Sequence, residues 1–237
     1  MSEVVKGRIS FNRGIEILNL LAENGSMSAS AIGREMGINQ SSATRLLQSL
    51  QQANLVYKPS YQSFAIDLGL LRLAGIALNS FPMVSRAVHA CNRLRQQHAY
   101  GYSVATLLNH QLIYLAHLEE TPSAALVLVD HSHFPLHQSS LGLCLAYSQG
   151  EKKFRSLLEH QNLHQTQIEA YWDFCEQTMT SEGYISLDHV GRNKSNSALS
   201  FEFKGRTYAF AVFCQEQNIP KKISLEILHQ GLQLLKE

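Results

Sequence analysis

The chain has few of the features that would assign it to a specialised class of protein. Its 237 residues include only 4 cysteines, 5 prolines and 1 tryptophan, and its formal net charge is +1. A balance of this kind neither demands nor excludes a nucleic-acid partner, so any basic surface must be local. The apolar fraction of 45% is that of an ordinary globular protein. The length allows one large or two small domains, each with its own core.

The cysteines are too dispersed to form a recognisable framework. Cys91, Cys144, Cys175 and Cys214 show no CxxC spacing. This excludes the usual zinc and disulfide patterns and is typical of reduced thiols in a cytoplasmic protein. We predict that all four are buried as small apolar residues.

The sequence also lacks long hydrophobic runs. No apolar stretch at the N-terminus resembles a signal peptide, and none anywhere approaches the roughly 18 residues of a membrane span. We therefore expect a cytoplasmic protein with no membrane partner.

Two helices joined by a glycine turn are predicted near the N-terminus. Residues 13–23 carry apolar side chains at helical spacing and are followed by Asn24 and Gly25. Ser28 is placed to cap a second helix, and Gly37 can adopt the left-handed conformation that turns the chain after it.

A third helix is predicted from Ser41. Ala43, Leu46, Leu47 and Leu50 form one apolar stripe, and the remaining positions are polar. The stripe would pack against the first two helices and leave a polar outer face.

Two short strands follow the third helix. Residues 55–57 and 63–66 have strand-like composition around a predicted turn at Pro59 and Ser60. Three helices and a hairpin in this order predict a winged helix-turn-helix domain over residues 1–67.

The third helix begins with small polar residues, as a helix that enters the major groove of DNA requires. Glutamine can read adenine through paired hydrogen bonds, and arginine can reach a guanine or a phosphate. The predicted contacts to double-stranded DNA are Gln40, Ser41, Ser42, Thr44 and Arg45 of this helix and Lys58 and Tyr61 at the hairpin tip. Alternatively, the serines only cap a helix in an ordinary three-helix core. A winged domain that binds protein would need an apolar outer face, and this face is polar.

A linker helix is predicted over residues 68–80 and a second domain over residues 81–237. That domain mixes strand-like and helical runs, which predicts an α+β sheet domain and not a doubly wound parallel one. The expected strands are 100–107, 111–118, 124–129, 198–203 and 208–214, and the expected helices are 83–98, 141–147, 152–159, 167–181 and 221–235.

Four stretches of the chain resemble the IclR family of bacterial transcriptional regulators. They are RGIEILNLLAENGSMSASAIGREMGINQSSATRLLQSLQQANLV, IDLGLLRLAGIAL, PLHQSSLGLCLAY and GYISLDH. The resemblance implies a DNA-binding domain joined by a helix to a GAF-like effector domain that binds a small, usually acidic, metabolite. It also implies a homodimer or homotetramer on near-palindromic operators, and no cofactor. The apolar character of the linker helix on more than one side agrees with packing on a partner subunit.

The resemblance also implies where an effector binds. Free backbone N–H groups at a helix start favour an anion such as a carboxylate. The positions that match the family site are Ser139, Ser140, Leu141, Gly142, Asp188, Ser197 and Cys214. Asp188 could instead be a solvated turn carboxylate, and Cys214 could be a core thiol.

Three positions depart from the family pattern. Leu141 replaces a small residue, Leu143 replaces a common lysine, and Phe201 adds bulk to a later strand. These changes predict a smaller or more apolar pocket, and they leave open an altered ligand or none.

Metal and enzyme chemistry has little support in the sequence. His131, His133 and His137 are close enough in sequence to ligate zinc if a further ligand came from elsewhere, but no HExxH motif accompanies them. No GxSxG motif or P-loop is present. We therefore predict a regulator with no catalytic residue, metal or cofactor. The alternative is a metabolite-binding or metal-binding sensor, or an enzyme, whose winged domain does not bind DNA.

Overall fold

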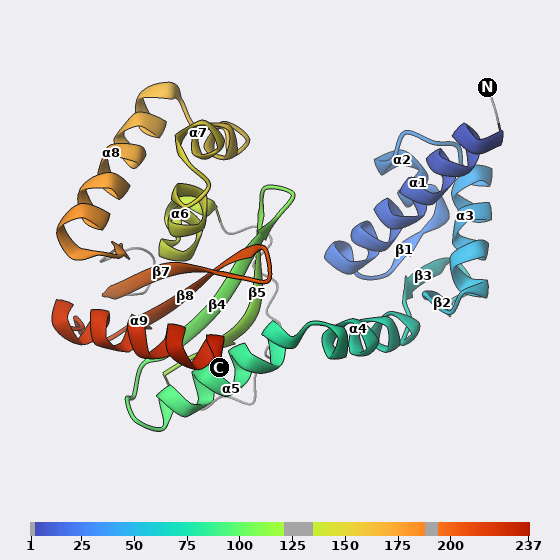
Figure 1. Cartoon of the computed structure of the whole chain (residues 1–237). Helices are drawn as coiled ribbons and strands as arrows, with labels where there is room; N and C mark the ends of the chain where they lie inside the picture. The colour runs from blue at the N-terminus through green and yellow to red at the C-terminus, as the bar shows by residue number, and fades with distance from the viewer. Residues whose placement is uncertain (1–2, 121–134, 188–193) are drawn as a thin grey trace. The chain divides into compact units, whose positions relative to one another are not determined.

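The computed structural model describes residues 3–120, 135–187 and 194–237 and divides the chain into two compact units, Met1–Ser80 and Phe81–Glu237. The predicted strand at 124–129 lies outside the described residues. Figure 1 shows the helices and strands of both units.

The N-terminal unit contains the predicted three helices and wing. Its helices are α1 (Glu3–Asn24), α2 (Ala29–Glu35), α3 (Gln40–Gln52) and α4 (Gly69–Ser80), and its strands are β1 (Met27–Ser28), β2 (Val56–Ser60) and β3 (Ser63–Ile66). The strands form an antiparallel sheet in the order β1-β3-β2. One core of buried side chains joins the helices to this sheet; its largest members are Ile17, Leu21, Ile32, Leu47 and Phe64.

The caps and the glycine turn confirm the sequence prediction for α2 and α3. The Ser28 hydroxyl accepts a hydrogen bond from the Ala31 N–H at 3.2 Å. Gly37 follows α2 with φ +62°, a conformation that side chains rarely adopt. The chain can therefore turn sharply between the two helices.

Two predicted boundaries in this unit are wrong. Helix α1 starts at Glu3 and not at Arg13. The prediction missed the earlier turns because residues 10–13 are all exposed and carry no apolar stripe. The turn of the wing falls at Tyr61 and Gln62, and Pro59 lies within β2. Because β2 is an edge strand, a proline without an N–H is tolerated there, and the β2–β3 register shifts at this point.

The C-terminal unit is an α+β domain around one sheet. Strands β4 (Gly101–Leu108), β5 (Gln111–Leu118), β6 (Ile185–Ser186), β7 (Ser195–Phe203) and β8 (Arg206–Cys214) pair antiparallel in the order β5-β4-β8-β7-β6. This confirms the predicted α+β class.

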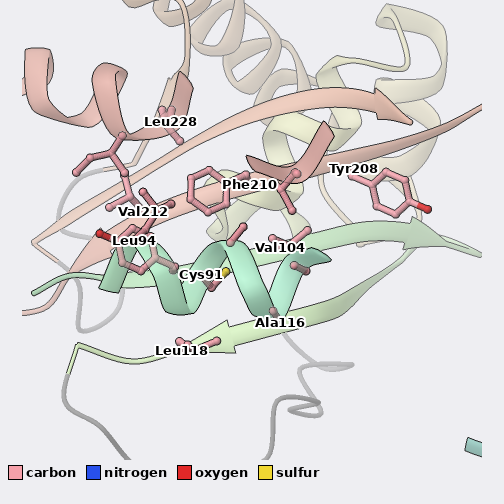
Figure 2. Packing of buried hydrophobic residues seen from close by; sticks show 14 of the residues in the cluster. Cys91, Leu94, Val104, Ala116, Leu118, Tyr208, Phe210, Val212 and Leu228 are labelled. Carbon is pink, nitrogen blue, oxygen red and sulfur yellow. The ribbon is translucent and has the colours of Figure 1, made fainter. Parts of the chain in front are cut away.

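Helices cover both faces of the sheet (Figure 1). On one face lie α5 (Pro82–Arg95) and α9 (Lys221–Lys236), and on the other lie the short helix η1 (Leu136–Gln138), α6 (Ser140–Tyr147), α7 (Glu151–Glu159) and α8 (Gln165–Glu182). Figure 2 shows Cys91 and Leu94 of α5 packed against Val104, Phe210 and Val212 of the sheet.

All four cysteines are buried and carry free thiols, as predicted. Cys91 and Cys214 belong to the cluster under α5 and α9, and Cys144 and Cys175 belong to the cluster on the α6 face. Burial raises the pKa of the Cys144 and Cys175 thiols to about 12.

Candidate functional sites

The first candidate site is the start of α3. Asn39 caps this helix: its Oδ1 accepts hydrogen bonds from the Ser42 N–H at 2.8 Å and from the Ser41 hydroxyl at 2.9 Å. Asn39 is not among the predicted site residues, although asparagine before a polar helix start is a recognised cap signal. Gln40 and Ser41 are exposed and Ser42 is half-buried.

The two faces of α3 differ sharply in chemistry. Ala43 and Leu47 are fully buried in the core. The sequence of α3 contains no carboxylate, and Arg45 is exposed on its outer face. The Thr44 hydroxyl donates to the Gln40 carbonyl at 2.8 Å. The outer face therefore presents one cation and several neutral polar groups.

The wing adds two of the predicted residues. Tyr61 lies in the turn and is 92% exposed. Lys58 is exposed on β2, with its Nζ 4.8 Å from the centre of the Phe64 ring. This cation–π contact places the Lys58 ammonium over the Phe64 ring on the wing.

The second candidate site is the start of α6. Ser139 caps the helix by accepting a hydrogen bond from the Gly142 N–H at 3.3 Å, and the buried Ser140 hydroxyl donates to Asn196 of β7. Within the described part of the chain, the Ser140 and Leu141 N–H groups have no hydrogen-bond acceptor. Such groups at a helix start can bind an anion.

Polar and aromatic side chains from the sheet also lie on the α6 face. The Ser103 hydroxyl is 2.7 Å from His117 Nδ1, and the His117 ring is stacked on Phe213 at 5.2 Å. Tyr114 contacts the edge of His117 and hydrogen-bonds Ser139, and burial raises the pKa of Tyr114. Sequence reasoning missed these residues because their grouping depends on strand register.

The register separates two predicted ligand residues from the α6 start. Ser197 pairs with Val212, which packs under α5 and α9, and Cys214 belongs to the same cluster. Their neighbours Asn196 and Phe213 face α6 instead, because successive residues of a strand point to opposite faces. Asp188 lies outside the described residues. Leu141 and Gly142 are buried within α6 itself.

His137 is the one member of the predicted histidine group within the described residues. Its ring contacts Tyr171 at 5.5 Å, and burial lowers its pKa. Its Nδ1 is buried and has no hydrogen-bond partner in the described part of the chain. His131 and His133 fall outside that part, and the residues inside it contain no cluster of three potential metal ligands.

The helix-turn-helix and its wing place the N-terminal unit in the class of winged helix-turn-helix proteins. In this chain a separate α+β unit follows that domain. In agreement, residues 10–60 match the family model described as the IclR helix-turn-helix domain. The transcriptional repressor AllR of Escherichia coli K12 is 28% identical over 162 residues, which cover 68% of this chain and 60% of AllR. The match thus spans less than two thirds of that relative's length.

Solved structures show the same fold over nearly the whole chain. An IclR family regulator from Brucella abortus superimposes with a TM-score of 0.78 at 16% identity, covering 94% of this chain and 91% of that one. An IclR homolog from Microbacterium hydrocarbonoxydans, complexed with 4-hydroxybenzoate, gives a TM-score of 0.76 at 18% identity, covering 96% and 97%. The chain is therefore similar to IclR family regulators in the sequence of its helix-turn-helix domain and in its fold.

Among the described residues, no helix combines the length and the apolar character that crossing a membrane requires.

Proposed function

We propose that the chain is a DNA-binding transcriptional regulator whose operator binding is modulated by a small metabolite, most simply a carboxylate. The observation that carries this proposal is the start of α3, which is exposed and contains no carboxylate. Asn39 caps this helix start, and the strands of the wing follow α3 in the chain. The IclR helix-turn-helix match and the description of AllR as a transcriptional repressor support it.

In this proposal α3 enters the major groove. Gln40 and Arg45 are the side chains with the reach and donors to read base edges, and Ser41, Ser42 and Thr44 add shorter polar contacts. Lys58 and Tyr61 of the wing contact the neighbouring phosphate backbone.

The effector binds at the start of α6. The unpartnered Ser140 and Leu141 N–H groups suit a carboxylate, and the Ser139 hydroxyl caps the same turn by accepting from the Gly142 N–H. Asp188, Ser197 and Cys214 stay predictions as ligand residues. The 4-hydroxybenzoate bound to one structural neighbour is itself a carboxylate on an aromatic ring, which agrees with a site that contains Tyr114 and Phe213.

The protein acts as a homodimer or homotetramer on a near-palindromic operator. Helix α4 buries none of its own residues, and Leu71, Leu73 and Ile76 are exposed along it. Three apolar side chains on one helix are costly to leave in water, so a second copy of the chain is the proposed cover. One recognition helix also reads too few base pairs to find a single genomic site.

The proposal assigns DNA reading to residues 1–67, linkage to residues 68–80 and effector binding to residues 81–237. For the effector to act, it must bind the DNA-competent and DNA-incompetent arrangements with different affinities. Location in the cytoplasm is part of the same proposal.

The experiment is selection of fragmented genomic DNA from the organism that encodes the chain. The purified protein is incubated with the fragments, and the retained DNA is sequenced, with Arg45→Ala as the test variant. Arg93→Ala is the matched control, because Arg93 is an exposed arginine on α5 of the other unit.

Enrichment of near-palindromic intergenic sites by the wild type and Arg93→Ala, and weaker enrichment by Arg45→Ala, is the expected result. Failure of folded protein to enrich any site at low and moderate salt would contradict the proposal and favour a sensor whose winged domain does not bind DNA.

Effector modulation is tested by calorimetry with 4-hydroxybenzoate as the probe, titrated into free and operator-bound protein. Equal affinities in the two titrations would refute the coupling even if DNA binding stands.

A further inference from the structure

A cavity of the C-terminal unit lies at the hairpin end of the sheet. Its volume is about 410 Å³, within the range of small-molecule sites. It is lined by the turn of the β4–β5 hairpin, the turn of the β7–β8 hairpin, the end of α6 and one side of α7. Figure 1 shows both hairpin turns at this end of the sheet. The cavity adjoins the last turn of α6, whereas the proposed effector site is at the first turn.

The charged groups of this cavity all have one sign. Lys153 and Arg206 line it, together with the imidazole of His110, and its lining includes no aspartate or glutamate. Among the described residues, neither Lys153 nor Arg206 has a carboxylate within 4.0 Å. By contrast Arg155, which is also on α7 but does not line the cavity, is paired with both Glu151 and Glu169.

Hydrogen bonds fix the lysine over the cavity. Lys153 Nζ donates to Gln149 Oε1 at 3.0 Å, and Gln149 Nε2 donates to the Thr207 hydroxyl at 3.4 Å. Thr207 in turn is tied to β4, because the Thr106 hydroxyl donates to its carbonyl at 2.7 Å. Two of the three N–H groups of the Lys153 ammonium therefore remain for a ligand. The Arg206 guanidinium adds its planar set of N–H donors.

The histidine of the cavity is also held in place. The His110 ring is stacked on His160 with 4.1 Å between ring centres, and His160 Nδ1 is 2.7 Å from the Ser156 carbonyl. The cavity therefore has donors on three sides, from α7, from β8 and from the β4–β5 turn.

We propose that this cavity binds a small dianion, either a phosphate monoester or a dicarboxylate. Two permanent cations without carboxylate partners, lining one cavity, match a ligand with two negative charges. Lys153 and His110 are held by their contacts before binding, so these two side chains lose little freedom when the ligand enters. The proposal concerns a second ligand site and holds whether or not the chain binds DNA.

The first test maps binding on the wild-type chain by heteronuclear NMR. Inorganic phosphate and succinate serve as probes, each titrated at constant ionic strength. We expect saturable shifts of the Gly205 and Thr207 amides, which belong to the cavity, and we use Gly142 and Leu143 to report on the α6 start. Phosphate alone, succinate alone or both shifting the cavity amides supports the proposal and selects the ligand class. Shifts confined to the α6 start, or no saturable shifts, would overturn it.

The second test uses two double variants that remove the same charge. Lys153→Gln with Arg206→Gln removes the cavity cations, and Lys152→Gln with Lys204→Gln removes adjacent cations that do not line the cavity. We expect the first pair to weaken probe binding in calorimetry by about tenfold or more, and the second by less than about twofold. Equal losses in both pairs would indicate a diffuse charge effect and overturn the site. Circular dichroism confirms that the variants remain folded.

Discussion

Asn39 determines which polar groups remain available at the start of α3. It takes the Ser41 hydroxyl hydrogen, and the Gln40 carbonyl takes that of Thr44. These two hydroxyls can therefore accept hydrogen bonds from a DNA base but have already used their donor within the helix. Gln40 and Arg45 keep their side-chain donors. Under the proposed function, these two residues provide most of the discrimination between bases.

The effect of Arg45→Ala on operator binding follows from this division of roles. We expect a loss of about 1–3 kcal/mol of binding free energy if Arg45 contacts a base, and a fall of about one in the salt slope if it contacts a phosphate. Fluorescence anisotropy with an operator duplex at several salt concentrations separates the two cases. Unchanged affinity and slope would remove Arg45 from the interface, and Ser41→Ala is the milder companion variant.

The thiols lead to a second prediction at this scale. Burial raises the pKa of Cys144 and Cys175 to about 12, so almost no thiolate is present near neutral pH, and Cys91 and Cys214 are likewise buried with raised pKa values. We expect the native chain to react slowly with Ellman's reagent and the unfolded chain to release four equivalents at once. A fast equivalent in the native state would show that one thiol is accessible.

At the scale of elements, α6 is held against η1 by a glycine. A Cβ atom built at Gly142 would lie 2.4 Å from the Leu136 carbonyl oxygen and 2.8 Å from the Leu136 Cα. Both atoms are backbone, so the helix start would have to move. The same contact thus determines both the packing of α6 and the position of its free N–H groups.

Gly142→Ala is therefore expected to destabilise the C-terminal unit by about 1–3 kcal/mol, the usual cost of overpacking. Urea denaturation followed by circular dichroism measures the change. Gly14→Ala is the control, because a Cβ there meets only Leu50 at an ordinary 3.8 Å, and alanine within a helix is favoured over glycine by about 0.5–1 kcal/mol. Equal stabilities of the Gly142→Ala variant and the wild type would mean that α6 can shift freely.

The elements also show how far sequence reasoning reached. Helices with a clear apolar stripe and strands with strong β-formers agree with the prediction: the start of α3 and both ends of α9 and β5 lie within one residue of the predicted positions. Strands of two residues, β1 and β6, were missed because two residues carry no periodicity. Cys214 was grouped with the start of α6 in one predicted site but lies on the opposite face of the sheet, because the face depends on register with β4 and β7, which one sequence does not reveal; its role as a ligand residue stays a prediction.

At the scale of the whole molecule, α4 is the feature that a monomer leaves unexplained. Leu71 and Ile76 are 68% and 58% exposed, although the helix has few polar residues to justify their position. The sequence predicts a linker helix over residues 68–80 that is apolar on more than one side. The bounds of α4, Gly69–Ser80, agree with the predicted range, and the surface that covers the helix remains a proposal.

We expect Leu71→Gln with Ile76→Gln to weaken self-association by at least about a hundredfold in dissociation constant, since each buried side chain contributes about 1.5–3 kcal/mol. Sedimentation velocity over a range of concentrations provides the measurement. Leu108→Gln, which alters an exposed leucine at the β4–β5 hairpin, should leave the association unchanged. A wild-type chain that sediments as a monomer at all concentrations would refute the proposed assembly.

The inaccessibility of the four thiols makes the chain a ready background for spectroscopic labelling. Tyr61 projects from the turn of the wing, so a Tyr61→Cys variant would carry the one reactive thiol and accept a nitroxide there. In a dimer the two nitroxides would report the distance between wings directly by pulsed electron paramagnetic resonance. If adding operator or 4-hydroxybenzoate narrows or shifts that distance distribution, the label measures how the two winged domains of the dimer move relative to each other.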